Sequence, residues 1–176
     1  MKNTKKIATI AVLAAAALSL AACGNEASET TTTAEAVSSN ENSQIANPWH
    51  DVDDLDAAKE EAGFEMSVPE SIDGYYLSEY RVTDEGDKII EVIFTENDSD
   101  MEIRLRKGEG SEDISGDYND YAYSSEINSG KDYTVKGDSE NALKLAVWTD
   151  GNFTYSVTSD NGLASEFFNE IVSSVE

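Results

Sequence analysis

The sequence predicts an α+β fold, a single domain over residues 48–176 with one antiparallel meander sheet of six to seven strands. Two observations lead to this class. Short segments of alternating apolar and polar residues are separated by turns such as 84–87 and 150–152, a pattern typical of β-hairpins. The chain then ends in an amphipathic segment with helical spacing. We expect this C-terminal helix and a short N-terminal helix to cover one sheet face, with the other face in water.

A lipoprotein signal peptide is predicted over residues 1–22. Three lysines in the first six residues precede an apolar run, and Leu20, Ala21, Ala22 and Cys23 form a lipobox. The run is too short and too rich in alanine to span about 30 Å of hydrocarbon. We therefore expect cleavage before Cys23, a covalent lipid on Cys23, and anchoring to the extracytoplasmic face of a cell membrane. The signal alone does not distinguish an inner from an outer membrane.

The charge and cysteine count exclude several functions. The signal holds three of the twelve basic residues and none of the 36 acidic ones, so the mature chain has nine against 36, a net charge of −27. This charge disfavours nucleic acid and anionic polymers as direct ligands. Because Cys23 is the only cysteine, its lipidation leaves no thiol for a disulfide, a zinc site or a nucleophile. Residues 23–47, rich in Ser, Thr and Glu, predict a disordered linker.

The domain is expected to begin with a helix over 51–62, for which Asp51, Asp53 and Asp54 are candidate N-caps and Gly63 is the stop. Residues 64–68 alternate into a proline, which predicts a brief edge strand or extended segment. Strands are expected over 75–83, 88–95, 101–107, 121–128, 133–136, 142–149 and 153–158.

Three elements have predicted faces. The strand 88–95 is apolar on both sides, which is typical of a central strand. In 101–107 the residues Met101, Ile103 and Leu105 should point inward, with Arg104 and Arg106 outward. The final helix, over 165–175, has Ser165 as its candidate N-cap. Its apolar stripe consists of Phe167, Phe168, Ile171, Val172 and Val175.

Residues 104–119 read Arg-Leu-Arg-Lys-Gly-Glu-Gly-Ser-Glu-Asp-Ile-Ser-Gly-Asp-Tyr-Asn. This block resembles a signature of uncharacterised surface lipoproteins of Clostridia-type Gram-positive bacteria, the family called domain of unknown function 4367 or a close relative. Similar blocks follow in order from Trp49 to the C-terminus, at 49–55, 62–64, 68–69, 135–137 and 146–151. The resemblance implies a Gram-positive cell-surface setting, and it brings no activity and no catalytic residues.

Oxygen-bearing side chains alternate along the segment after 101–107. Asp113, Ser115, Asp117 and Asn119 stand at every second position, which is typical of calcium loops. The pattern departs from an EF-hand, because glycine is at its fourth position instead of the sixth and Ser124 is at its twelfth. The segment therefore has two interpretations, a weak calcium site or an ordered loop folded back on the sheet.

Cationic and aromatic residues surround this segment. Arg104, Arg106 and Lys107 could bind a carboxylate or phosphate, but we favour pairing with Glu112, Asp113 or Asp117 that pins the loop. Tyr118 and Tyr121 could stack on a sugar or on a partner's side chains. The alternative for these tyrosines is ordinary packing against strands.

Catalytic motifs are lacking. His50 is the only histidine and stands at the linker boundary, so the sequence does not favour a Ser-His-Asp triad, and no HExxH or phosphate-binding loop is present. We expect a non-enzymatic binding module that contacts an unknown envelope protein or ligand and carries no cofactor besides its lipid. The alternatives are a small-ligand or lipid carrier, if the final helix closes a cavity, and a weak calcium-binding module.

Overall fold

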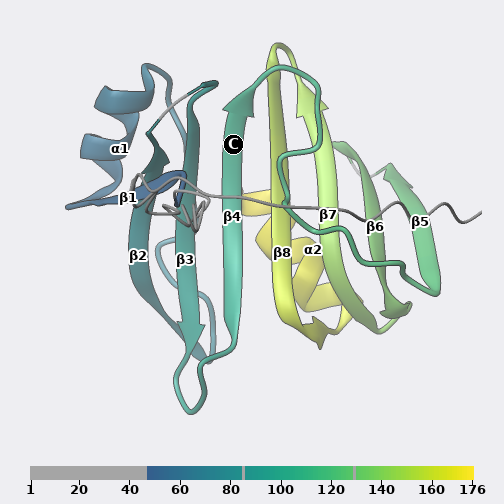
Figure 1. The fold of residues 1–176 in the computed structure, drawn as a ribbon. Coiled ribbons are helices and arrows are strands. Elements are labelled where there is room, and N and C mark those ends of the chain that lie inside the picture. Colours follow the sequence, from purple (N-terminus) through teal and green to yellow (C-terminus); the bar gives the residue numbers. More distant parts are fainter. Residues whose placement is uncertain (1–46, 85, 129) are drawn as a thin grey trace, which may run out of the picture. The chain divides into compact units, whose positions relative to one another are not determined.

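The computed structural model describes residues 47–84, 86–128 and 130–176 (Figure 1). The predicted signal peptide, the predicted lipobox with Cys23 and all of the predicted linker except its last residue lie outside these ranges. Within them, eight strands form one antiparallel sheet accompanied by two helices. None of the described helices has the length and apolar character needed to cross a bilayer. The elements are β1 (Trp49–Val52), α1 (Leu55–Ala62), β2 (Tyr75–Thr83), β3 (Ile89–Glu96), β4 (Glu102–Glu109), β5 (Tyr123–Asn128), β6 (Asp132–Ser139), β7 (Ala142–Asp150), β8 (Phe153–Leu163) and α2 (Ser165–Ser174).

The α+β class and the antiparallel sheet are confirmed, but the expected six to seven strands are wrong. The additional strand is β1, which pairs with β2 from Trp49 opposite Thr83 to Val52 opposite Tyr80. The helix expected from Asp51 therefore begins at Leu55. Its N-cap is Asp54, whose Oδ1 accepts a hydrogen bond from the Ala57 amide at 2.8 Å.

The sheet is not a single meander. Its strand order is β1-β2-β3-β4-β8-β7-β6-β5, so two meanders of four strands meet where β4 pairs with β8. Without this pairing, β4 and β8 would each be an exposed edge strand of its meander. The chain must then travel from β4 to the far edge at β5. It does so through residues 110–122, here called the crossover loop, which passes in front of β8, β7 and β6 (Figure 1).

One sheet face is covered by both helices and holds the core. Cross-strand neighbours on this helix face include Val92, Leu105 and Val157, each fully buried. α2 adds Phe168, Ile171 and Val172, as its stripe predicted, and α1 adds Ala58. The opposite face, here called the open face, carries the crossover loop. The expectation that this second face is simply in water is therefore wrong over β8, β7 and β6.

Two expectations for β4 and its flank fail. Met101 precedes the strand and is 43% exposed, so it does not contribute to the core. Lys107 lies on the helix face opposite Tyr155, away from the open face of Arg104 and Arg106. Its Nζ is 4.8 Å from the ring centre of Phe153 and 4.9 Å from that of Tyr155. The two aromatic rings thus stabilise the charged ammonium of Lys107 at a buried position, where a cation without such contacts would be unfavourable.

The ends of α2 are held by other parts of the chain. Ser165 is not the N-cap: that position is Ala164, and the Ser165 hydroxyl donates instead to the Glu140 carbonyl. At the other end, the Lys131 ammonium donates to the carbonyls of Val175 at 2.6 Å and Val172 at 3.3 Å. A cation at these last carbonyls complements the helix dipole.

His50 connects β1 to two neighbouring elements. Its Nε2 lies 2.8 Å from a Glu61 carboxylate oxygen on α1, and its Nδ1 lies 2.7 Å from Asp84. Lys88 binds the other Glu61 oxygen at 3.0 Å. The hydrogen bond to Glu61 raises the pKa of His50 above its ordinary value of 6.5, because the partly offsetting effect of burial is smaller.

We expect an NMR pH titration of the His50 ring to give a pKa above 6.5. Because the folded state favours the imidazolium, the contribution of His50 to stability is complete below pH 6.5 and is lost as the pH rises through the folded-state pKa. His50→Gln should remove this component of the pH dependence. A ring pKa at or below the ordinary value would contradict the two-carboxylate arrangement.

Candidate functional site

Arg106 is at the centre of the open face. Its Nε and Nη2 both lie 2.6 Å from one carboxylate oxygen of Glu91 on β3, and Glu91 is only 1% exposed. Arg81 approaches the other oxygen at 3.6 Å. The ring of Trp49 lies 4.9 Å from the Arg106 guanidinium carbon. The buried carboxylate of Glu91 is thereby neutralised by two guanidinium groups, one of which is stacked on an aromatic ring.

The same guanidinium holds the crossover loop. Nη1 of Arg106 donates to the carbonyls of Ile114 at 2.9 Å and Ser115 at 2.6 Å. The prediction that Arg106 pairs with Glu112, Asp113 or Asp117 is therefore wrong. The carboxylate that Arg106 binds is that of Glu91, and its contacts with the loop are to backbone carbonyls. Gly116 permits this approach. Its φ is +68°, and a Cβ there would lie 2.8 Å from Nη1.

Three consecutive side-chain turns stabilise the loop. Oδ1 of Asp113 accepts from the Ser115 amide at 2.8 Å, and the hydroxyl of Ser115 accepts from the Asp117 amide at 3.2 Å. Asp117 Oδ1 then accepts from the Asn119 amide at 2.8 Å. These turns account for the alternating oxygen spacing that predicted calcium ligands. In the described parts of the chain, no three His, Cys, Asp or Glu side chains are arranged to hold a metal ion.

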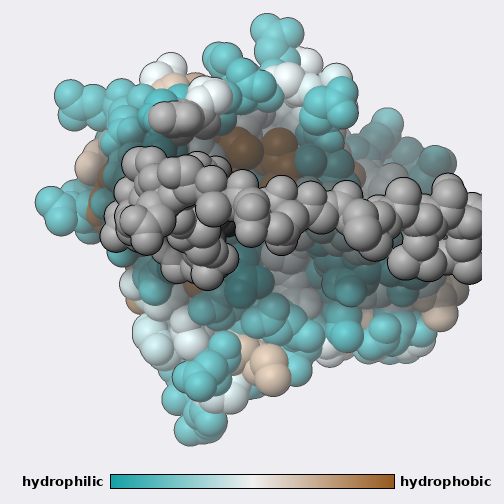
Figure 2. Space-filling view, in the orientation of Figure 1, coloured by the Kyte–Doolittle hydropathy of each residue, from teal (hydrophilic) through white to brown (hydrophobic). Residues whose placement is uncertain are grey.

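The crossover loop borders two hollows on the open face. The polar hollow, of about 620 Å³, lies between the loop residues 115–121 and side chains of β4, β6, β7 and β8. The mixed hollow, of about 520 Å³, lies between Asp113 and the strands β5 to β7, and its lining continues around these strands to core residues such as Trp148. The space-filling view of this side is mainly hydrophilic, with a small hydrophobic patch (Figure 2).

The cations of the polar hollow are already neutralised. Arg104 pairs with Glu102 at 2.5 Å and with Asp160 at 3.2 Å, and Lys144 pairs with Asp138 at 3.0 Å. These are partly exposed pairs, so their effect on stability is small. The expectation that Arg104 pairs with an acidic residue of the crossover loop is therefore also wrong, since its partners come from β4 and β8.

Tyr121 and Asp117 form the most perturbed pair of the loop. The Tyr121 hydroxyl donates to Asp117 Oδ2 at 2.5 Å. Burial, reinforced by this bond, raises the pKa of Tyr121 to about 12. Burial alone would raise the pKa of Asp117, but the hydrogen bonds from Tyr121 and Asn119 outweigh it and lower that pKa. Asp117 is therefore ionised at neutral pH and accepts the hydrogen bonds from Tyr121 and Asn119 that fix this part of the crossover loop.

Tyr118 differs from every other aromatic residue of the described chain in its exposure. It stands between Asp117 and Asn119, two residues fixed by the turns, yet its own side chain is 96% exposed.

Comparison with known proteins found no match for this chain among protein-family models, curated proteins or solved structures. The resemblance to surface lipoproteins therefore remains a prediction, and function has to be inferred from the site.

Sequence reasoning found Arg106 and the crossover loop but missed Glu91, Trp49 and Gly116. A signal for Glu91 was present, because it is a lone charge inside the apolar run 89–94 of a strand expected to be central. Such a residue needs a buried cationic partner. Trp49 carried no comparable signal, because its role depends on the pairing of β1 with β2.

Proposed function

We propose that this chain is a lipid-anchored, non-enzymatic module on the extracytoplasmic face of a cell membrane, and that its crossover loop binds an envelope protein. The lipobox ending at Cys23 supports the anchoring. The single observation that carries the binding role is Tyr118, a fully exposed aromatic side chain on a loop that is otherwise fixed. Exposed tyrosines are frequent anchors of protein interfaces.

The fixed backbone favours binding because little conformational entropy is lost on association. Arg106 and the three turns already hold the segment 113–119 in one arrangement. The exposed carboxylates of Glu112 and Asp120 lie at either side of Tyr118 in sequence. Together with the overall acidic charge, they favour a partner with a basic surface.

The other functions receive less support. The space between α2 and the sheet is occupied by core side chains such as Phe168 and the stacked rings of Trp148 and Tyr155, 5.1 Å apart, which does not favour a lipid carrier. Both ring nitrogens of His50 face carboxylates, an arrangement that supports a structural role better than that of a catalytic base.

Tyr118→Ala is expected to weaken partner binding at least about tenfold while leaving stability within about 0.5 kcal/mol of the wild type. The full-length chain, purified in detergent, would be used to capture proteins from solubilised envelopes, and the captured protein's affinity would then be measured for both forms. Tyr76→Ala is the matched control, because Tyr76 is 52% exposed on β2. Equal capture by the Tyr118 and Tyr76 variants would rule out the loop as the binding surface.

A further inference from the structure

Lys136 is the only basic residue in the described chain that has no hydrogen bond, ion pair or ring contact. The other eight all have such partners: Lys59, Arg81, Lys88, Arg104, Lys107, Arg106, Lys131 and Lys144. The Lys136 ammonium also attracts the Asp117 carboxylate through space. In a chain with 36 acidic residues, an unpaired ammonium group is a specific feature that solubility does not explain.

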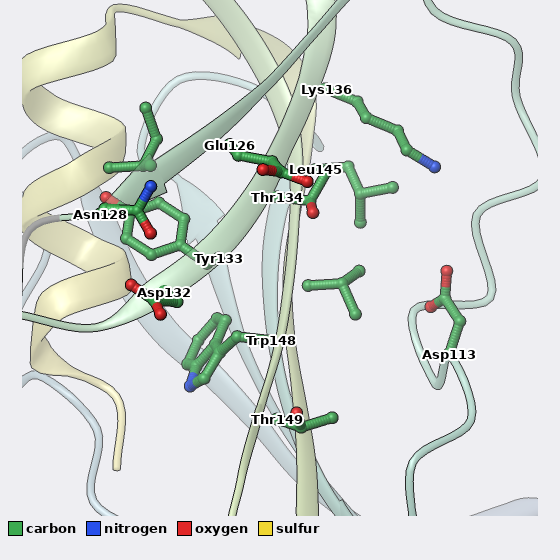
Figure 3. A pocket seen from close by; sticks show the side chains of 12 residues that line it. Asp113, Glu126, Asn128, Asp132, Tyr133, Thr134, Lys136, Leu145, Trp148 and Thr149 are labelled. Atoms are coloured by element: carbon green, nitrogen blue, oxygen red, sulfur yellow. The ribbon is translucent and has the colours of Figure 1, made fainter.

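Lys136 lines the mixed hollow. Figure 3 shows its ammonium on the same side of the sheet as the crossover loop, where Asp113 faces Leu145 and Lys136. The register places Lys136 beside Leu145, and Thr134 beside Val147, on neighbouring strands of the open face. The volume of about 520 Å³ is in the range of small-molecule sites.

Three carboxylates line this hollow, those of Asp113, Glu126 and Asp132, and the first two lie on the side of the Lys136 ammonium and the open face. Asp113 uses Oδ1 in its turn with Ser115, which leaves Oδ2 available. Glu126 is exposed on the edge strand β5 and has no ion pair within the described ranges. The hollow therefore combines one unpaired cation, three carboxylates and the partly exposed apolar side chain of Val147.

We propose that the mixed hollow binds a zwitterionic α-amino acid or short peptide with an apolar side chain. The Lys136 ammonium binds the ligand's carboxylate, and Asp113 and Glu126 bind its ammonium group. Val147, the partly exposed apolar residue of the open face in this hollow, contacts the side chain. This site includes neither Tyr118 nor a protein partner. Its experimental test is therefore independent of the test of the proposed binding through the crossover loop.

The two charge signs select a zwitterion over simpler ligands. A simple anion such as a fatty acid would meet Lys136 but would be repelled by Asp113 and Glu126. A simple cation would leave the Lys136 ammonium without a partner and would be repelled by it. A ligand that carries both charges satisfies all three side chains together.

Calorimetric titration of the full-length chain with four probes tests this site. L-Leucine and the dipeptide Leu-Leu carry both charges, N-acetyl-L-leucine keeps only the negative one, and L-leucinamide keeps only the positive one. At least one zwitterion should bind, and each singly charged probe should bind at least about tenfold more weakly. The stronger of the two zwitterions identifies a free amino acid or a peptide as the ligand. No heat from either zwitterion at millimolar concentration would overturn the proposal, as would equal binding of N-acetyl-L-leucine.

Lys136→Met should reduce the affinity for the bound zwitterion at least about tenfold, because the carboxylate loses its charged partner. Lys59→Met, which removes the same charge from α1, should leave it unchanged. Glu126→Gln provides a second variant on the exposed rim, with an expected loss in the same direction. Unchanged affinity in both Lys136→Met and Glu126→Gln would place any observed binding elsewhere and overturn the assignment.

Discussion

Arg106→Ala is expected to lower the free energy of unfolding by about 3–5 kcal/mol, the cost of removing one partner from a buried ion pair. The variant leaves the carboxylate of Glu91, 1% exposed, with only Arg81 at 3.6 Å. It also removes the donor to the carbonyls of Ile114 and Ser115. Urea denaturation of the full-length chain at neutral pH measures the effect.

The control for this experiment is Arg104→Ala on the same strand and the same face. Arg104 also forms two ion pairs, but its side chain is 31% exposed, so we expect a loss of at most about 1 kcal/mol. If the two alanine variants cost the same, burial of the Glu91–Arg106 pair does not determine its importance. The double variant Glu91→Gln/Arg106→Met should lose less than the sum of its single variants, because it leaves no unpaired charge.

Gly137→Ala should cost about 3 kcal/mol, at the upper end for overpacking in a structured site. Gly137 lies at an irregularity between β6 and β7, where the register shifts on both sides of it. A Cβ at this position would be 2.2 Å from the Ala142 carbonyl oxygen and 2.7 Å from the Leu143 Cα. Both contacts would be with backbone atoms of β7, so β6 and β7 would have to move apart to accommodate the added methyl group.

Ser139→Ala, at the end of the same strand, is the matched control and should change stability by no more than about 0.5 kcal/mol, since Ser139 is exposed. Denaturation of the two variants side by side separates backbone crowding from a general sensitivity of the hairpin. A Gly137→Ala variant as stable as the Ser139 variant would show that β6 and β7 do not approach this closely.

Local patterns predicted most of the individual elements. β3 is buried on both faces, as its apolar residues on both sides indicated, and α2 buries Phe168, Ile171 and Val172. Ile103 and Leu105 alternate with Arg104 and Arg106 as expected. These features depend on residues within one strand or helix, and the periodicity of the sequence reports them directly.

Pairing between distant segments was not predictable in the same way. The four residues of β1 include a histidine and an aspartate, and they form a strand only because β2 offers its edge. The contact of β4 with β8 joins residues more than 40 positions apart, and no local pattern indicates it. Because the prediction placed consecutive strands side by side, it also missed that the loop crosses β8, β7 and β6 to reach β5, although one of its two interpretations was a loop folded back on the sheet.

The candidate site shows the same division. The block 104–119 was recognised as one unit, and Arg106 and the loop residues 114–115 do contact each other. The partner Glu91 belongs to another strand, so its identity depends on the register of β3 with β4, which places Glu91 beside Arg106. Lys107 was grouped with the arginines by charge, although strand alternation alone would have placed it on the helix face.

Amide hydrogen exchange of the crossover loop tests most directly whether this loop is fixed on the open face. In the full-length chain the amides of Ser115, Asp117 and Asn119, each bonded to a side chain, should exchange more slowly than that of Tyr118. In Arg106→Ala this protection should be lost. Equally fast exchange of all four amides in the wild type, or unchanged protection in the variant, would contradict a loop held in place by Arg106.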